Sequence, residues 1–145
     1  MNKHRIQRSA TIRLDGPIET VFPLFGPIRE KDWAEGWDPR IIIPTGVLVE
    51  KHMVFQTSHG NEVFTWIIVN YEPGKFFIEY LVTATERLWT ITVQCTPNDA
   101  QTFAMITYSY TGLTEVGIHN NEAAIKKMFS HDLKDWEQAI NDYLQ

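Results

Sequence analysis

Between residues 47 and 112 the chain repeats one pattern, in which a short segment of alternating apolar and polar side chains is followed by a tight turn signal. The segments are Val47 to Thr57, Val63 to Tyr71, Lys75 to Ala84, Arg87 to Thr96 and Thr102 to Gly112. Residues 58–61, 72–74, 85–86 and 97–100 separate them, and these connections contain residue types that favour turns. Strands joined by such short connections must pair antiparallel. The pattern therefore predicts a meander of five antiparallel strands.

The residues before the meander predict further strands and two short helices. Arg5 to Leu14 alternates with one apolar face and is interpreted as a first strand. Pro17 follows it and is favoured in the first turn of a helix. Pro23, Gly26 and Pro27 interrupt this helix, so we expect a second short helical turn over Ile28 to Lys31. A short strand at Ile41 to Ile43 would make seven strands in all.

The last segment, Glu122 to Leu144, has apolar residues at helical spacing and polar residues on the opposite side. It predicts one amphipathic helix of about 22 residues, roughly 33 Å long, which is enough to cross the sheet. Asn120 or Asn121 is the expected N-cap. The 145 residues contain no linker or repeat, so we expect a single α+β domain over residues 1–145.

Composition and motifs exclude several classes of function. A net charge of -5 argues against binding to nucleic acid, and no apolar run reaches the roughly 20 residues of a membrane span. Cys95 is the only cysteine, which rules out an intramolecular disulfide and favours a cytoplasmic location. The histidines lack the spacing of a zinc site, and the glycines do not form a phosphate-binding loop. We therefore expect that the protein binds no metal and no cofactor. We also expect it to be a monomer or a homodimer.

The order of elements resembles the START/Bet v 1-like superfamily, also called SRPBCC or polyketide cyclase-like proteins. The resemblance rests on Pro17 to Phe22, on Trp33 to Pro39, on the turn Tyr71 to Gly74 and on the terminal helix. It implies a helix-grip fold, in which a curved antiparallel sheet of six or seven strands wraps around the long C-terminal helix. It also implies a ligand cavity between sheet and helix, with the Trp33 to Pro39 segment near its mouth. Alternatively, Trp33 and Trp37 only plug the open end.

The residues expected to line this cavity are mostly aromatic. On the meander they are Phe64, Trp66, Ile78, Tyr80, Trp89, Ile91, Tyr108 and Tyr110, and on the helix Met128, Phe129, Asp132 and Trp136. A shift of one residue in strand register would exchange inward and outward side chains, so simple core packing remains the alternative for each aromatic residue. The expected ligand is a small hydrophobic or amphipathic molecule such as a lipid, a polyketide or an aromatic metabolite.

Two charged residues interrupt apolar faces. On a helical wheel Asp132 lies between Met128 and Trp136, inside the apolar stripe. It is the candidate catalytic residue or polar anchor of the cavity, unless it pairs with a cation or with backbone donors. Arg8 lies on the apolar face of the first strand and could bind a ligand carboxylate or pair with Asp132 or Glu79.

Three functions stay open at this point. The first is binding of a small hydrophobic ligand. The second is a cofactor-independent cyclase or dehydratase, in which Asp132 would shuttle protons. The third is a protein-interaction module like the Hsp90-activator branch of the superfamily, acting through the outer surface.

Overall fold

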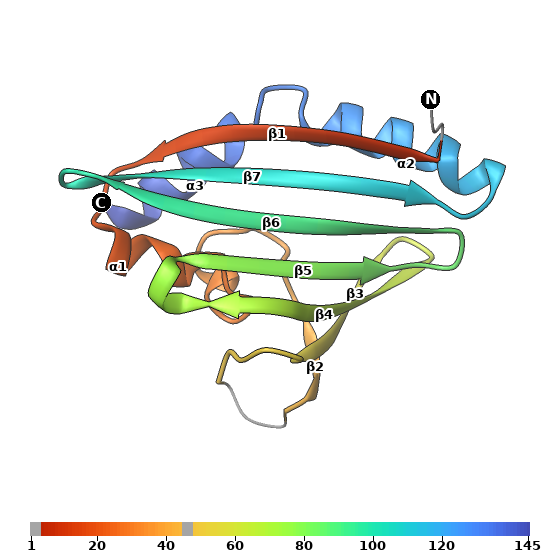
Figure 1. Ribbon diagram of the computed structural model, residues 1–145, viewed down its shortest axis with the longest axis horizontal. Coiled ribbons are helices and arrows are strands. Elements are labelled where there is room, and N and C mark those ends of the chain that lie inside the picture. The colour runs from red at the N-terminus through yellow and green to blue at the C-terminus, as the bar shows by residue number, and fades with distance from the viewer. Residues whose placement is uncertain (1–3, 45–47) are drawn as a thin grey trace.

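The computed structural model describes residues 4–44 and 48–145. Seven antiparallel strands form one curved sheet in the order β1-β7-β6-β5-β4-β3-β2 (Figure 1). The strands are β1 (Arg5–Leu14), β2 (Arg40–Ile43), β3 (Val54–His59), β4 (Glu62–Glu72), β5 (Phe77–Thr83), β6 (Arg87–Asn98) and β7 (Gln101–Gly112). The predicted helix-grip sheet is confirmed, although β3 begins seven residues later than the expected Val47. Val47 itself lies outside the described part of the chain.

The strand register places the aromatic residues of the meander on one face. Tyr80 of β5 lies opposite Ile91 of β6, which in turn lies opposite Tyr108 of β7. Trp89 is paired with Tyr110 in the same way. Because side chains alternate along a strand, these residues point to the same side of the sheet, and all of them are buried.

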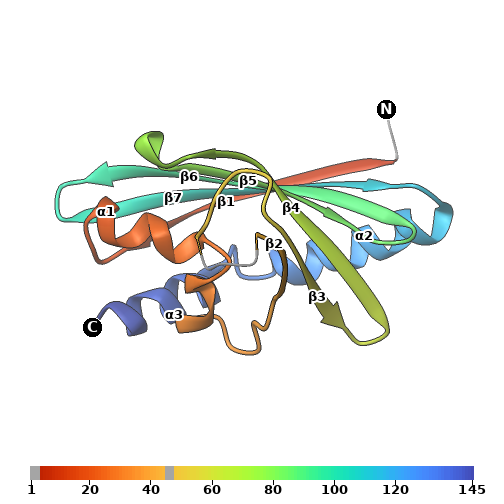
Figure 2. The ribbon, with the colours of Figure 1, turned by 90° about the horizontal axis from the view of Figure 1, so that it is seen from below.

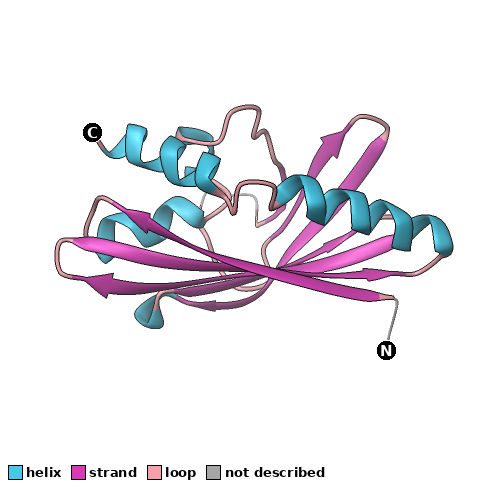
Figure 3. Ribbon diagram, turned by 90° about the horizontal axis from the view of Figure 1, so that it is seen from above, coloured by secondary structure: helices cyan, strands magenta, loops and turns pink. Residues whose placement is uncertain are grey.

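All the longer helices cover that same face of the sheet (Figures 2 and 3). The short helices are α1 (Ile18–Val21) and the 3₁₀ turns η1 (Phe22–Phe25), η2 (Arg29–Asp32) and η3 (Pro73–Lys75), and the C-terminal helices are α2 (Glu115–Met128) and α3 (Lys134–Leu144). The β3–β4 hairpin bends toward the helices in both views. The sheet therefore surrounds the helical layer on more than one side.

The C-terminal helical segment differs from the prediction in two ways. It begins at Glu115, because the Thr114 hydroxyl accepts a hydrogen bond from the Gly117 amide at 3.1 Å, so the expected caps Asn120 and Asn121 lie inside the helix. It also breaks between α2 and α3, where Asp132 and Leu133 have φ values of 50° and 61°. Two successive residues in the left-handed region cannot continue a right-handed helix.

The start of α2 packs closely on the turn between β5 and β6. Gly117 lies against the backbone of Glu86, leaving no room for a Cβ atom. The Leu113 amide also donates to the Glu86 carbonyl at 2.8 Å. These contacts fix one end of the helical layer against the sheet.

No helix in the described ranges is long and apolar enough to cross a membrane.

Candidate functional site

A cavity of about 1330 Å³ lies between the sheet and the helices. This is larger than the roughly 300–1,000 Å³ of typical small-molecule pockets. Its wall comes from β2 to β7, from η2 and the loop that follows it, and from both C-terminal helices. The chain has 5 tryptophans, and every one of them lines this cavity: Trp33, Trp37, Trp66, Trp89 and Trp136.

Most of the residues expected from the sequence do line the cavity. They are Phe64, Trp66, Tyr80, Trp89, Ile91, Tyr108, Tyr110, Met128 and Trp136. Ile78 and Phe129 are buried in the core instead and are not part of the cavity wall. Phe129 makes an edge-to-face contact with Tyr108, with ring centroids 5.7 Å apart, so it supports the wall from behind.

The predicted position of Asp132 inside an apolar helical stripe is wrong. The wheel assumed a continuous helix, but Asp132 stands at the break, where its side chain is 68% exposed. It pairs with Arg8 at 3.4 Å, and the Arg8 side chain is 48% exposed. The conservative alternative, an arginine–carboxylate pair, is the arrangement found. Neither residue belongs to the cavity wall.

The loop after η2 is tied to the helical turns by its two indole groups. The indole nitrogen of Trp33 donates to the carbonyl oxygen of Leu24 at 2.7 Å, and that of Trp37 donates to Pro27 at 2.7 Å. Trp33 also lies 5.6 Å from Trp136 of α3 between ring centroids. Both tryptophans therefore form part of the cavity wall and hold the loop in place.

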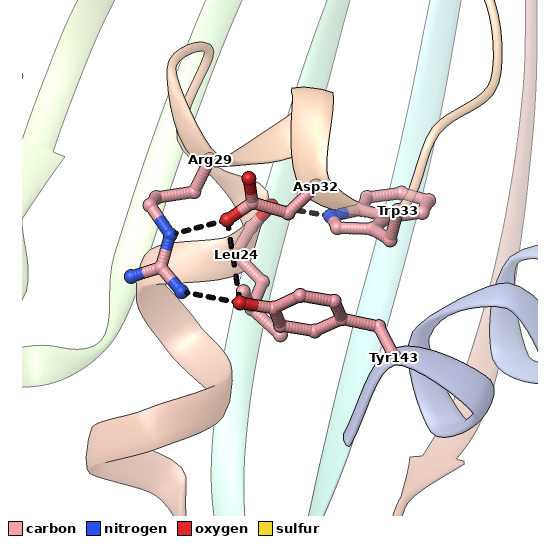
Figure 4. A network of polar contacts seen from close by, with 5 residues as sticks. All are labelled: Leu24, Arg29, Asp32, Trp33 and Tyr143. Atoms are coloured by element: carbon pink, nitrogen blue, oxygen red, sulfur yellow. Dashed lines mark hydrogen bonds and ion pairs between the residues drawn. The ribbon is translucent and has the colours of Figure 1, made fainter. Parts of the chain in front are cut away.

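Glu30 of η2 is a cavity residue that the sequence analysis missed. A 3₁₀ helix has three residues per turn, so side chains three positions apart lie on the same side. Arg29 and Asp32 therefore lie on one side of η2, and Glu30 and Trp33 lie on another. Arg29 donates to the Asp32 carboxylate at 2.8 Å and to the Tyr143 hydroxyl at 3.2 Å (Figure 4). The outer side of η2 is thereby fastened to α3, and the inner side lines the cavity.

The carboxyl of Glu30 forms no hydrogen bond or ion pair within residues 4–44 and 48–145. Its side chain is half-buried, and its remaining surface faces the cavity. Burial raises the pKa of Glu30 well above 4.5, since the surroundings disfavour the charged form. The sequence Arg29-Glu30-Lys31-Asp32 gave no sign of this, because four charged residues are typical of a solvated turn.

Tyr80 and Tyr108 are the tyrosines that interact electrostatically with Glu30. Burial raises the pKa of each well above 10, and the Glu30 charge raises both further. The Tyr80 hydroxyl donates to the carbonyl oxygen of Phe25 at 2.7 Å. The Tyr108 hydroxyl has no hydrogen-bond partner in the described part of the protein. Glu30 and Tyr108 thus offer unengaged polar groups to the cavity.

A second polar region surrounds Arg87 of β6. Its guanidinium donates to Glu62 at 3.1 Å and to Asn121 at 3.4 Å, and it lies over the ring of Trp89 at 4.8 Å. Burial raises the pKa of Tyr110 to about 12, although the Arg87 charge opposes this rise. Arg87 therefore has an anionic partner, whereas Glu30 has no cationic one.

Neither Cys95 nor a group of potential metal ligands provides a reactive centre among the described residues. Cys95 is buried away from the cavity wall, and burial raises the pKa of its thiol to about 12, so it stays protonated near neutral pH. Within the described ranges no three histidine, cysteine or acidic side chains are grouped as metal ligands.

Comparison with known proteins yields structural likeness alone. No family model matches the chain. No curated protein matches it in sequence. Norcoclaurine synthase from Thalictrum flavum has a TM-score of 0.70 at 10% identity, over 97% of this chain and 86% of that one. The aromatase/cyclase Zhui from Streptomyces sp. R1128 has a TM-score of 0.65 at 13% identity, over 97% and 92%. Ara h 8.0201 has a TM-score of 0.67 at 9% identity, over 97% of each chain.

Proposed function

Since the chain has the helix-grip fold of START/Bet v 1-like proteins, we propose that it binds a small apolar or aromatic molecule in its internal cavity. One observation carries this proposal: a space of about 1330 Å³ into which all 5 tryptophans face. Protein interiors are close-packed, with few voids larger than a water molecule. A fold that used these rings only as core would close the space.

Apolar contact supplies the affinity in this proposal. A ligand that buries about 300 Å² of apolar surface gains about 7 kcal/mol before the costs of association. Aromatic rings add edge-to-face contacts of the kind already present between Trp37 and Trp66, whose centroids lie 5.3 Å apart. The polar groups of the wall then decide which ligand is accepted.

A second function, cofactor-independent cyclase or dehydratase chemistry, is favoured by the position of Glu30. Such chemistry needs a positioned acid or base in the cavity. Asp132 stands outside the wall, whereas Glu30 lines it together with Tyr80 and Tyr108. Two structural neighbours are named a synthase and an aromatase/cyclase, which makes the same cavity suitable for testing with polycarbonyl compounds.

Two adjacent alanines of α2 provide a matched test of ligand binding. Ala124 lines the cavity, and Ala123 is exposed on the same helix. We expect the neutral fluorophore N-phenyl-1-naphthylamine to bind the wild type and Ala123→Trp alike, and Ala124→Trp at least tenfold more weakly. Equal binding by both variants would contradict a site in the cavity.

Native mass spectrometry of the purified protein, followed by denaturing extraction, identifies any natural ligand. We expect an added mass that the extraction assigns to a small hydrophobic molecule. Recovery of a stoichiometric protein partner with an empty cavity would favour an interaction module instead.

A further inference from the structure

Glu30 places a carboxyl without a counter-ion inside an aromatic cavity. The basic side chains of the wall are Arg40 on β2, His59 on β3, Arg87 on β6, Lys127 on α2 and His131 in the segment between α2 and α3. None of them forms an ion pair with Glu30. The acidic side chains of the wall are Glu35, Asp38, Glu62 and Asp135, and all four are exposed. No charge on the facing elements therefore stabilises an ionised Glu30.

Such a carboxyl is stable when it keeps its proton. An ionised carboxylate in apolar surroundings is costly unless it is paired, and the usual result is protonation. Burial raises the pKa of Glu30 well above its ordinary value, which favours the protonated form. A protonated carboxyl has one O–H donor, so Glu30 presents a hydrogen-bond donor to whatever fills the cavity.

Tyr108 supplies a second donor on the facing strand. Tyr108 is 5% exposed, and its hydroxyl has no hydrogen-bond partner among the described residues. Tyr80 differs, because its proton is already donated to Phe25. Tyr110 also lines the cavity, but its electrostatic partner is Arg87 and not Glu30. Glu30 and Tyr108 are thus two cavity donors without a hydrogen-bond partner in the described part of the chain, and they also interact electrostatically with each other.

We propose that Glu30 and Tyr108 together form a two-donor site for a neutral acceptor oxygen, such as the carbonyl of an aromatic ketone. This inference rests on the proposed ligand-binding function and names the chemical group that the cavity selects. Two hydrogen-bond donors can satisfy both lone pairs of one carbonyl oxygen. An organic cation is disfavoured, because Glu30 would have to ionise before it could serve as the counter-ion.

The test compares two neutral probes that differ in one group. 2-Acetylnaphthalene carries a carbonyl, and 2-isopropenylnaphthalene has C=CH₂ in its place; both are measured by displacement of N-phenyl-1-naphthylamine. We expect Glu30→Leu and Tyr108→Phe each to weaken the ketone about three- to tenfold, the effect of one hydrogen bond, and to leave the hydrocarbon unchanged. Tyr110→Phe is the matched control and should leave both probes unchanged.

The pH dependence separates the proton from the shape of the side chain. Ketone affinity should fall in the wild type as the pH rises through the raised pKa of Glu30, because the donor is lost. It should stay constant in Glu30→Gln, whose amide donates at every pH.

Each other outcome overturns the proposal. Equal losses for ketone and hydrocarbon would show that Glu30 and Tyr108 only shape the wall. A (naphthylmethyl)trimethylammonium probe, whose charge does not depend on pH, that binds the wild type more tightly as pH rises would show that Glu30 acts as a counter-ion. If the wild type and every variant bound the hydrocarbon as tightly as the ketone, this inference would end and the proposed function would still stand. Failure of N-phenyl-1-naphthylamine, the ketone and the hydrocarbon to bind the wild type would end both this inference and the proposed function.

Discussion

The raised pKa of Glu30 predicts a specific dependence of folding stability on pH. Between the pKa of a glutamate in the unfolded chain and the raised pKa in the folded protein, the folded state holds the Glu30 proton and the unfolded state does not. Raising the pH through this interval therefore destabilises the protein. Glu30→Gln has no proton to lose, so its stability relative to the wild type should increase with pH.

One proton sets the size of this effect. The largest slope is about 1.4 kcal/mol per pH unit, and the accumulated difference between pH 5 and pH 7 is at most about 2.7 kcal/mol. The tyrosines of the cavity do not contribute in this range, because burial moves the pKa of Tyr80 and Tyr108 upward from 10. The difference between variant and wild type also cancels every group that the two proteins share.

Urea unfolding followed by tryptophan fluorescence, at each pH from 5 to 8, measures the difference. Glu35→Gln is the matched control, since it removes an exposed carboxyl from the loop next to η2. We expect the curve for Glu30→Gln to rise with pH more steeply than the curve for Glu35→Gln. Identical pH dependences for the two variants would refute a protonated Glu30, and with it the two-donor site.

Three further substitutions test the architecture around the cavity. Tyr80→Phe removes the hydrogen bond to Phe25 and should cost about 1–2 kcal/mol, measured as a lower midpoint of thermal unfolding. Gly117→Ala forces a Cβ atom against the backbone of Glu86 and should destabilise by about 1–3 kcal/mol in urea; an unchanged midpoint would show that α2 is not held there. Asp132→Asn breaks an exposed ion pair and should change stability by less than about 1 kcal/mol, with the affinity for N-phenyl-1-naphthylamine unaltered; a large loss of affinity would return Asp132 to the site.

The sheet could be predicted from the sequence because alternate residues of a strand point inward, and burial requires these residues to be apolar. Alternation of apolar and polar residues placed the ends of β6 and β7 to within two residues, whereas the side that faces the helices became known only from the strand register. The C-terminal helices were harder. Phe129 and Leu133 are both buried, so the apolar pattern runs through the break without a glycine or proline to mark it. The wheel built on that pattern then assigned Asp132 to the cavity.

Glu30 could not be predicted, because its position depends on contacts made by other residues. Whether η2 turns Glu30 or Arg29 inward depends on what holds its outer side. Arg29 and Asp32 both meet the hydroxyl of Tyr143, at the far end of the chain. This information lies in the pairing of distant segments and not in the local pattern.

The break in the C-terminal helix and the inward position of Glu30 are physically connected. Helix α2 is fastened to the β5–β6 turn through Gly117, while α3 is fastened to β1, where the Arg13 amide donates to Glu137 at 2.7 Å. Each helix keeps its own anchor because a loop interrupts the helical segment between them (Figure 3). In this position α3 brings the Tyr143 hydroxyl to Arg29 and Asp32 on the outer side of η2. The left-handed residues at the break thus help to aim a carboxyl into the cavity, although they lie outside the cavity wall.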